Sequence, residues 1–240
     1  MKNNFKKNLK KELYQINRPY QSTIDFNKFI IKKKQFKPKT KILDAGCGIG
    51  NNTIYFAQKH KSVEFTGGDY SKKNVLLAKK KFKNIKNLSF TYFDILKKKN
   101  NFKNKFDGII SIHTMCCFKD ISKPIKLLCE LNPQWICFKT LAYDADMDVL
   151  IHIRDFDSKI KDKNPDGDFN IFSEKKIINE FKKNKFKAEI QNYYPLKKII
   201  NSNKKKRGSY SIKTDFHQNT VFSGPVYLPW KFIFAKKIDV

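Results

Sequence analysis

Arginine is scarce in this 240-residue chain, although the chain is strongly basic. The formal net charge is +29, yet only three of the 51 basic residues are arginine: Arg18, Arg154 and Arg207. Proteins that read bases or clamp phosphates usually rely on the planar guanidinium group, which binds in a bidentate way. We therefore interpret the lysines as a solvated surface, and we keep a polyanion-binding face as the alternative.

Paired cysteines and long apolar runs are also missing. The five cysteines are odd in number and show no CxxC spacing, which disfavours both a disulfide framework and a zinc site. The N-terminal stretch MKNNFKKNLKKEL lacks the apolar core of a signal peptide, and no apolar run approaches the roughly 20 residues that cross a bilayer. We expect a cytoplasmic protein with reduced thiols and no membrane partner.

What the chain does contain is a regular alternation of short apolar runs and amphipathic segments. Strands are expected at 41–46, 63–71, 88–95, 106–115 and 135–141, and helices at 51–60, 73–82 and 121–131. Strands that alternate with helices form βαβ units, so a parallel sheet with right-handed crossovers is predicted.

The rest of the chain departs from this alternation. Residues 1–36 are predicted to form a helical cap, with a helix from Tyr14 to Ile31 that is interrupted near Pro19. Residues 37–240 form the main domain. Within the main domain we expect a substrate-pocket insertion at 143–172, a helix at 173–186 capped by Ser173, a strand at 187–196, a hairpin at 209–228 and a last strand at 230–238.

A glycine-rich string follows the first predicted strand and precedes the first helix. It reads Asp44-Ala45-Gly46-Cys47-Gly48-Ile49-Gly50. Glycines allow a sharp turn and a close approach of the backbone to a ligand, which then meets N–H groups at a helix N-terminus. Acidic residues close the next two strands: Asp69, 19 positions after Gly50, and Asp94. A carboxylate at the second strand end is suited to ribose hydroxyls.

These strings resemble the class I S-adenosylmethionine-dependent methyltransferases. LDAGCGIG matches the (D/E)xGxGxG loop of that family, and GGDYS, FDI and FDGIISIHTM are similar to its next three motifs. The resemblance implies S-adenosylmethionine as cofactor and a Rossmann-like three-layer α/β sandwich, with a mostly parallel seven-stranded sheet whose last strand is antiparallel. A turn without ligand and a nicotinamide site are the alternatives; the second is disfavoured because the spacing is GxGxG rather than GxGxxG.

The same resemblance implies a set of cofactor-binding residues. Asp44, Gly46 and Gly48 would surround the methionine moiety, Asp69 would hold the ribose, and Tyr20 and Gln21 would close over the cofactor. The full set is Tyr20, Gln21, Asp44, Gly46, Cys47, Gly48, Gly50, Asp69, Tyr70, Asp94, Ile95 and Ser111, in which Tyr70, Asp94 and Ile95 contact the adenine and Ser111 lies beside the methionine.

Candidates for acceptor chemistry follow the fourth and fifth predicted strands. His113 is either a general base or a polar residue at the pocket rim. His152 and Asp155 could abstract a proton together, with helix-surface ion pairs as the alternative. The substrate candidates are Tyr143, Asp144 and Arg154. Asp144, Asp146 and Asp148 form a DxDxD string that we interpret as a pocket rim, with no metal assigned.

The predicted activity is methyl transfer to an oxygen or nitrogen of a small molecule, such as a sugar- or phosphate-bearing metabolite. The ending SGPVYLPWKFIFAKK, together with the insertion, is similar to methyltransferases of bacterial surface-glycan clusters, which indicates polysaccharide biosynthesis. One alternative is an RNA or DNA methyltransferase, but SIHT stands where a base-methylating enzyme would carry (D/N)PPY, so no specific nucleic acid is expected. The other is a cofactor-binding protein without turnover.

Overall fold

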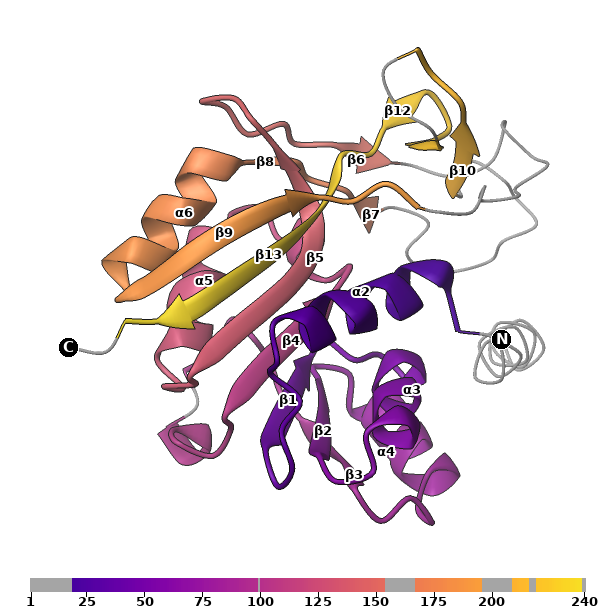
Figure 1. The fold of residues 1–240 in the computed structure, drawn as a ribbon, viewed down its shortest axis with the longest axis vertical. Coiled ribbons are helices and arrows are strands. Elements are labelled where there is room, and N and C mark those ends of the chain that lie inside the picture. The colour runs from indigo at the N-terminus through magenta and orange to yellow at the C-terminus, as the bar shows by residue number, and fades with distance from the viewer. Residues whose placement is uncertain (1–18, 99, 154–166, 196–208, 216–218, 239–240) are drawn as a thin grey trace.

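A computed structural model describes residues 19–98, 100–153, 167–195, 209–215 and 219–238. Its central sheet has the strand order β3-β2-β1-β4-β5-β13-β9, with a short β8 beside β5 (Figure 1). The bounds are β1 (Lys41–Ala45), β2 (Glu64–Asp69), β3 (Leu88–Tyr92), β4 (Gly108–Ile112), β5 (Trp135–Tyr143), β8 (Phe172–Ser173), β9 (Phe186–Asn192) and β13 (Trp230–Lys237). Strands β1 to β5 are parallel, and β13 runs antiparallel to both neighbours. This arrangement confirms the predicted Rossmann-like fold.

Helices cover both faces of the sheet. One layer holds α2 (Gln21–Lys32), α3 (Asn51–Lys59) and α4 (Lys72–Lys81), and the other holds α5 (Ser122–Cys129) and α6 (Glu174–Lys183). Phe26 of α2 packs on Phe232 of β13 with ring centroids 5.5 Å apart, and Phe181 of α6 packs on Phe138 of β5 at 5.6 Å. Within the described residues, no helix is long and apolar enough to cross a membrane.

The burial of strand β5 on both faces explains its apolar sequence. Its side chains alternate between the two faces, as a pleated strand requires. Cys137 and Leu141 belong to the core under α2 and α3, whereas Ile136 and Phe138 belong to the core under α5 and α6. A strand buried on both faces is therefore a nearly continuous apolar run, with Lys139 and Thr140 as its buried polar exceptions.

The antiparallel direction of β13 brings extra segments to one edge of the sheet. Because Trp230 pairs with Leu141, the start of β13 lies at the carboxyl edge of the parallel strands. A second sheet, formed by β10 (Ser209–Ile212), β11 (Thr220–Ser223) and β12 (Val226–Tyr227), precedes β13 and lies near the top of Figure 1. Its strands β10 and β11 pair antiparallel where the sequence predicts a hairpin. Both this sheet and the segment after β5 thus connect at the carboxyl edge.

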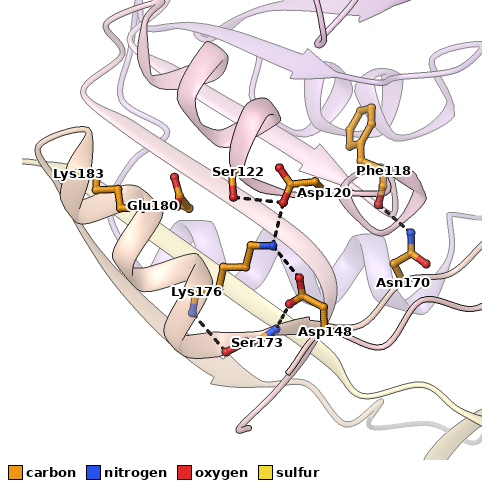
Figure 2. Close-up of polar contacts among 9 residues, drawn as sticks. All are labelled: Phe118, Asp120, Ser122, Asp148, Asn170, Ser173, Lys176, Glu180 and Lys183. Atoms are coloured by element: carbon orange, nitrogen blue, oxygen red, sulfur yellow. Dashed lines mark hydrogen bonds and ion pairs between the residues drawn. The ribbon is translucent and has the colours of Figure 1, made fainter. Parts of the chain in front are cut away.

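The segment after β5 is tied to α6 and to the loop after β4. It contains β6 (His152–Ile153) and β7 (Gly167–Asp168), which pair antiparallel. Figure 2 shows the Nζ of Lys176 between two carboxylates, 2.8 Å from Asp120 and 2.7 Å from Asp148. The Asn170 amide donates to the carbonyl of Phe118 at 2.8 Å. These contacts position the insertion above the strand ends.

One predicted element boundary is corrected by the backbone. Helix α2 begins at Gln21, after an extended Tyr20 with ψ of 144°, in keeping with the interruption predicted near Pro19; residues 14–18, where the prediction starts the helix, lie outside the described part. The strand predicted at 106–115 ends at Ile112, because His113 has a φ of 63° that no strand accommodates. A single turn of 3₁₀-helix, η2 (Met115–Cys117), follows.

Candidate functional site

The glycine loop between β1 and α3 presents open backbone. Gly46 and Gly48 have φ of 82° and 60°, in the left-handed region that favours glycine. A Cβ at Gly46 would overlap the side chain of Thr114, whereas a Cβ at Gly48 would meet no atom within 4 Å. Gly46 is thus required by packing, and Gly48 leaves backbone facing free space. That free space fits the predicted cofactor, whose methionine end would lie against Gly48.

Asp69 at the end of β2 organises this loop. The side chain is 4% exposed, and its carboxylate accepts hydrogen bonds from the Gly48 N–H at 2.8 Å, the Ser71 N–H at 2.9 Å and the Asn74 amide at 3.2 Å. A carboxylate has about four lone-pair sites. Asp69 therefore has capacity for about one further donor, such as a ribose hydroxyl.

Asp44 is more enclosed than the sequence suggests. Its side chain is 1% exposed and accepts a hydrogen bond from the Thr53 hydroxyl at 2.7 Å. Burial raises the pKa of Asp44 from its ordinary 3.8 to about 7; the Thr53 hydrogen bond opposes this shift and the charge of Asp69 adds to it. The predicted contact with a cofactor amine would bring a cation that favours the charged carboxylate.

The predicted adenine residues lie past the ends of β2 and β3. Tyr70 is 74% exposed, so its ring face is open to a ligand, and Ile95 is buried. Asp94 accepts the Leu96 N–H at 3.0 Å and forms an exposed ion pair with Lys97. These positions are compatible with an adenine pocket, and the individual contacts stay predictions.

Three further cofactor candidates, Ser111, Cys47 and Gly50, lie in or beside the core. Ser111 is fully buried and donates to the Ala45 carbonyl at 2.7 Å, so its hydroxyl joins β4 to β1 instead of lining an open surface. Cys47 is buried and its Sγ lies 3.4 Å from the Gly48 carbonyl oxygen. Gly50 precedes the first residue of α3.

The start of α2 lies beside the first turn of α3. The Thr23 hydroxyl donates to the Asn52 side chain at 2.7 Å, which joins the two helices next to the glycine loop. Tyr20 is half exposed just before α2, and the Gln21 amide donates to Asp25 at 2.9 Å. Tyr20 and Gln21 therefore lie at the end of α2 that adjoins α3, and their closure over the cofactor stays a prediction.

His113 and Lys139 form a close pair at the ends of β4 and β5. The His113 Nε2 and the Lys139 Nζ are 2.6 Å apart. Lys139 is 2% exposed, and its Nζ lies 4.1 Å from the ring centroid of Trp230 and 4.8 Å from that of Tyr193. The adjacent Thr114 hydroxyl donates to the Gly46 carbonyl at 3.2 Å, so this pair adjoins the glycine loop.

Burial governs the protonation of this pair. It lowers the pKa of Lys139 from its ordinary 10.5 to about 7, against the opposing influence of Cys116 and Asp25. Burial also lowers the pKa of His113 well below its ordinary value, and the charge of Lys139 lowers it further. Our sequence reasoning missed Lys139. The available signal was a single lysine in the apolar string WICFKTL.

The other acceptor candidates are placed differently from the prediction. The sequence pairs His152 with Asp155, but the His152 Nδ1 contacts Asp168 at 2.9 Å because β6 and β7 lie side by side. Asp155 and Arg154 lie outside the described residues. Tyr143 and Asp144 are exposed at the end of β5, and their role in binding substrate stays a prediction.

Two carboxylates of the DxDxD string pair with neighbouring lysines of α6. Asp146 pairs with Lys175 at 2.8 Å and Asp148 with Lys176 at 2.7 Å. Within the part of the chain that the structure describes, no three His, Cys, Asp or Glu side chains are grouped as metal ligands. The string acts as an attachment of the insertion.

The sheet order and the glycine loop define a Rossmann-like α/β protein, a fold in which ligands bind at the carboxyl edge of the sheet. Comparisons with known proteins specify the class. Residues 36–193 match the model of a family described as a methyltransferase domain. An (S)-coclaurine N-methyltransferase from Papaver somniferum is 27% identical over 122 residues, which cover 47% of this chain and 34% of that protein. The chain thus spans about a third of that relative's length.

Solved structures share the fold at low identity. The YcgJ protein from Bacillus subtilis superposes with a TM-score of 0.59 at 13% identity, covering 90% of this chain and 99% of that one. A magnesium protoporphyrin IX methyltransferase from Synechocystis PCC 6803, solved with bound SAM, superposes with a TM-score of 0.55 at 16% identity, covering 90% and 78%.

Because the family model spans most of the sheet, the chain belongs to this methyltransferase domain family. Its fold is the Rossmann-like fold of class I methyltransferases, which the SAM-bound Synechocystis structure shares.

Proposed function

We propose that this protein transfers the methyl group of S-adenosylmethionine to an oxygen or nitrogen of a small molecule. The observation that carries the proposal is the meeting of two features at one sheet edge. The open side of Gly48, where a Cβ would meet no atom, would receive the cofactor. His113, paired with Lys139, is adjacent in the chain to Thr114, which contacts the glycine loop. When bound, the cofactor supplies an electrophilic methyl group on a sulfonium.

The cofactor would be held by residues of three strand ends. Gly48 would let the methionine moiety approach the backbone where no Cβ stands, with Gly46 packed behind it on Thr114, and Asp69 would accept a ribose hydroxyl. Tyr70 would stack on the adenine with its exposed ring. Asp44 would face the amine from beneath the loop. The enzyme itself then mainly positions the acceptor for in-line displacement.

The acceptor would bind where the insertion and the second sheet meet the strand ends. Tyr143 and Asp144 rise from β5 at this edge. Aromatic side chains gather nearby, among them Tyr193, Tyr227 and Trp230, around a space that holds at most about one water molecule. The acceptor would therefore lie against the exposed Tyr143 and Asp144 rather than inside this space. Within this proposal, a sugar- or phosphate-bearing intermediate of glycan biosynthesis is the preferred acceptor.

The proposal is tested in two stages. Calorimetry with S-adenosylhomocysteine measures cofactor binding, which we expect in the micromolar range. Radiolabelled methyl transfer is then followed into a small-molecule extract, total RNA and genomic DNA at about 150 mM salt, where loose contacts are screened. We expect label only in small molecules. Saturable label in one nucleic acid would replace the proposal by its alternative, and binding without label anywhere would favour a protein without turnover.

A further inference from the structure

We propose that Lys139 is a positioning residue that acts as a neutral amine: it accepts the Nε2–H of His113 and so presents the His113 Nδ1 lone pair to the methyl acceptor. This inference rests on the proposed function, and it deepens that function by stating how the acceptor loses its proton. The contact that motivates it is the 2.6 Å distance between the Lys139 Nζ and the His113 Nε2.

The geometry leaves one ring nitrogen available. Nε2 of His113 is engaged by Lys139, and within the described residues Nδ1 makes no hydrogen bond to the protein. His113 as a residue is half-buried, whereas Lys139 behind it is 2% exposed. An acceptor at the sheet edge could therefore reach His113 but not Lys139. The tautomer of a histidine is set by the partner of its other nitrogen, which here is an amine.

The backbone at His113 supports a functional role. Its φ of 63° is unusual for a residue with a side chain, and such strain is concentrated at functional sites. The His113 N–H donates to the Lys139 carbonyl at 2.9 Å, which holds the two residues in register at their strand ends. The neighbouring Thr114 contacts Gly46. The strained residue thus stands between the glycine loop and β5.

The surroundings of Lys139 favour an amine that can gain a proton. Burial disfavours its ammonium form, and the pKa falls to about 7. Among the groups that face it, Asp25 of α2 and Cys116 of η2 favour the charged form, and His113 is its direct partner. Tyr193, which follows β9, donates its hydroxyl to Asp25 at 3.1 Å and offers Lys139 its ring face.

The proton balance of the proposed step is complete. The acceptor gives its O–H or N–H proton to Nδ1 of His113 while its bond to the methyl carbon forms and the carbon–sulfur bond breaks, with that electron pair staying on sulfur. The Nε2 proton of His113 passes to Lys139. The resulting ammonium lies 4.1 Å from the Trp230 ring centroid, where a cation–π interaction stabilises it. Solvent later removes the proton through His113.

Nuclear magnetic resonance of ¹⁵N-labelled histidine tests this assignment, with S-adenosylhomocysteine as the bound probe. His113→Gln assigns the signal. Between pH 6 and 9 we expect His113 to change from the Nδ1–H tautomer to the Nε2–H tautomer with a midpoint near 7, without becoming an imidazolium. Lys139→Arg, which stays charged, should keep the Nδ1–H tautomer throughout. The control Lys28→Met, at an exposed lysine of α2, should behave as the wild type.

Two results would overturn the inference. One is an Nδ1–H tautomer in the wild type up to pH 9, which would make Lys139 a permanent ammonium. The other is an unchanged tautomer switch in Lys139→Arg. If Lys139→Arg does not fold, as judged by loss of probe binding, Lys139→Met replaces it and should abolish the switch near pH 7. The NMR measurement of the His113 tautomer needs no methyl acceptor. Absence of S-adenosylhomocysteine binding to the folded wild type would therefore contradict the proposed function, independently of the result for His113.

Discussion

The side chain of Thr114 fills the space that a Cβ on Gly46 would need, so the loop after β4 and the glycine loop after β1 pack directly on each other. The Thr114 hydroxyl also donates to the Gly46 carbonyl at 3.2 Å. This contact joins the proposed cofactor position to the residues that would meet the acceptor. It also distinguishes Gly46, which packs on Thr114, from Gly48, which does not, although a sequence motif treats the two glycines alike.

Gly46→Ala and Gly48→Ala should therefore differ. Both introduce a Cβ at positive φ, which costs on the order of 1–2 kcal/mol, but only Gly46→Ala also overlaps Thr114. We expect a clearly larger loss of stability for Gly46→Ala in urea unfolding. Gly48→Ala should fold and bind S-adenosylhomocysteine at least tenfold more weakly, because its methyl group occupies the ligand space. Equal stability losses would contradict the packing argument.

Asp44 should cause the free energy of unfolding to decrease as pH rises. Its pKa is about 7 in the folded protein and near 3.8 in the unfolded chain, so between these values only the folded state binds the proton. The contribution of Asp44 to the free energy of unfolding then falls with pH, by at most roughly 4 kcal/mol at 1.36 kcal/mol per unit.

Asp44→Asn should remove this dependence. We expect the difference in unfolding free energy, variant minus wild type, to increase from pH 5 to pH 8 in the absence of ligand. Asp146→Asn at an exposed carboxylate serves as the control, and its difference should stay constant. A flat difference for Asp44→Asn as well would show that Asp44 is ionised in the folded protein.

His113→Gln should reduce turnover and preserve cofactor binding. Loss of a general base typically costs 10²–10⁴-fold in rate, whereas the glycine loop is untouched. We expect a fall in kcat of about 10²-fold on the acceptor identified by the label screen, with an unchanged Kd for S-adenosylhomocysteine. His152→Gln is the matched control, since His152 pairs with Asp168 on the insertion. If only His152→Gln reduced kcat, the base would lie on the insertion.

Lys176→Met should loosen the insertion. Its ammonium connects Asp120 after β4 to Asp148 after β5 and is only partly exposed. Removal leaves both carboxylates without their shared cation, so hydrogen exchange and proteolysis should increase near Asp148 while the central sheet stays protected. Lys175→Met, at a largely exposed pair with Asp146, should have little effect. Equal protection in both variants would mean that other contacts hold the insertion.

The amino-acid sequence predicted the class of fold from its strand–helix alternation, and its resemblance to a known family implied the cofactor. The strand–helix alternation and the string from Asp44 to Gly50 depend on neighbours in the chain: a strand needs its apolar run, and a tight turn needs its glycines. The N-cap at Ser173 belongs to the same category, since its hydroxyl accepts the Lys176 N–H three residues later. Local rules therefore suffice for these features.

Only the tertiary structure decided which side chains meet. Lys139 contacts His113, 26 positions away, because β4 and β5 are neighbours in register. Trp230 reaches the same place because β13 runs antiparallel, and His152 pairs with Asp168 because β6 and β7 lie side by side. Such contacts come from sheet order and burial, which also displace the pKa values of Asp44 and Lys139. Neither the side-chain contacts nor the pKa values can be predicted from residues adjacent in the chain, since both depend on what packs around a side chain in three dimensions.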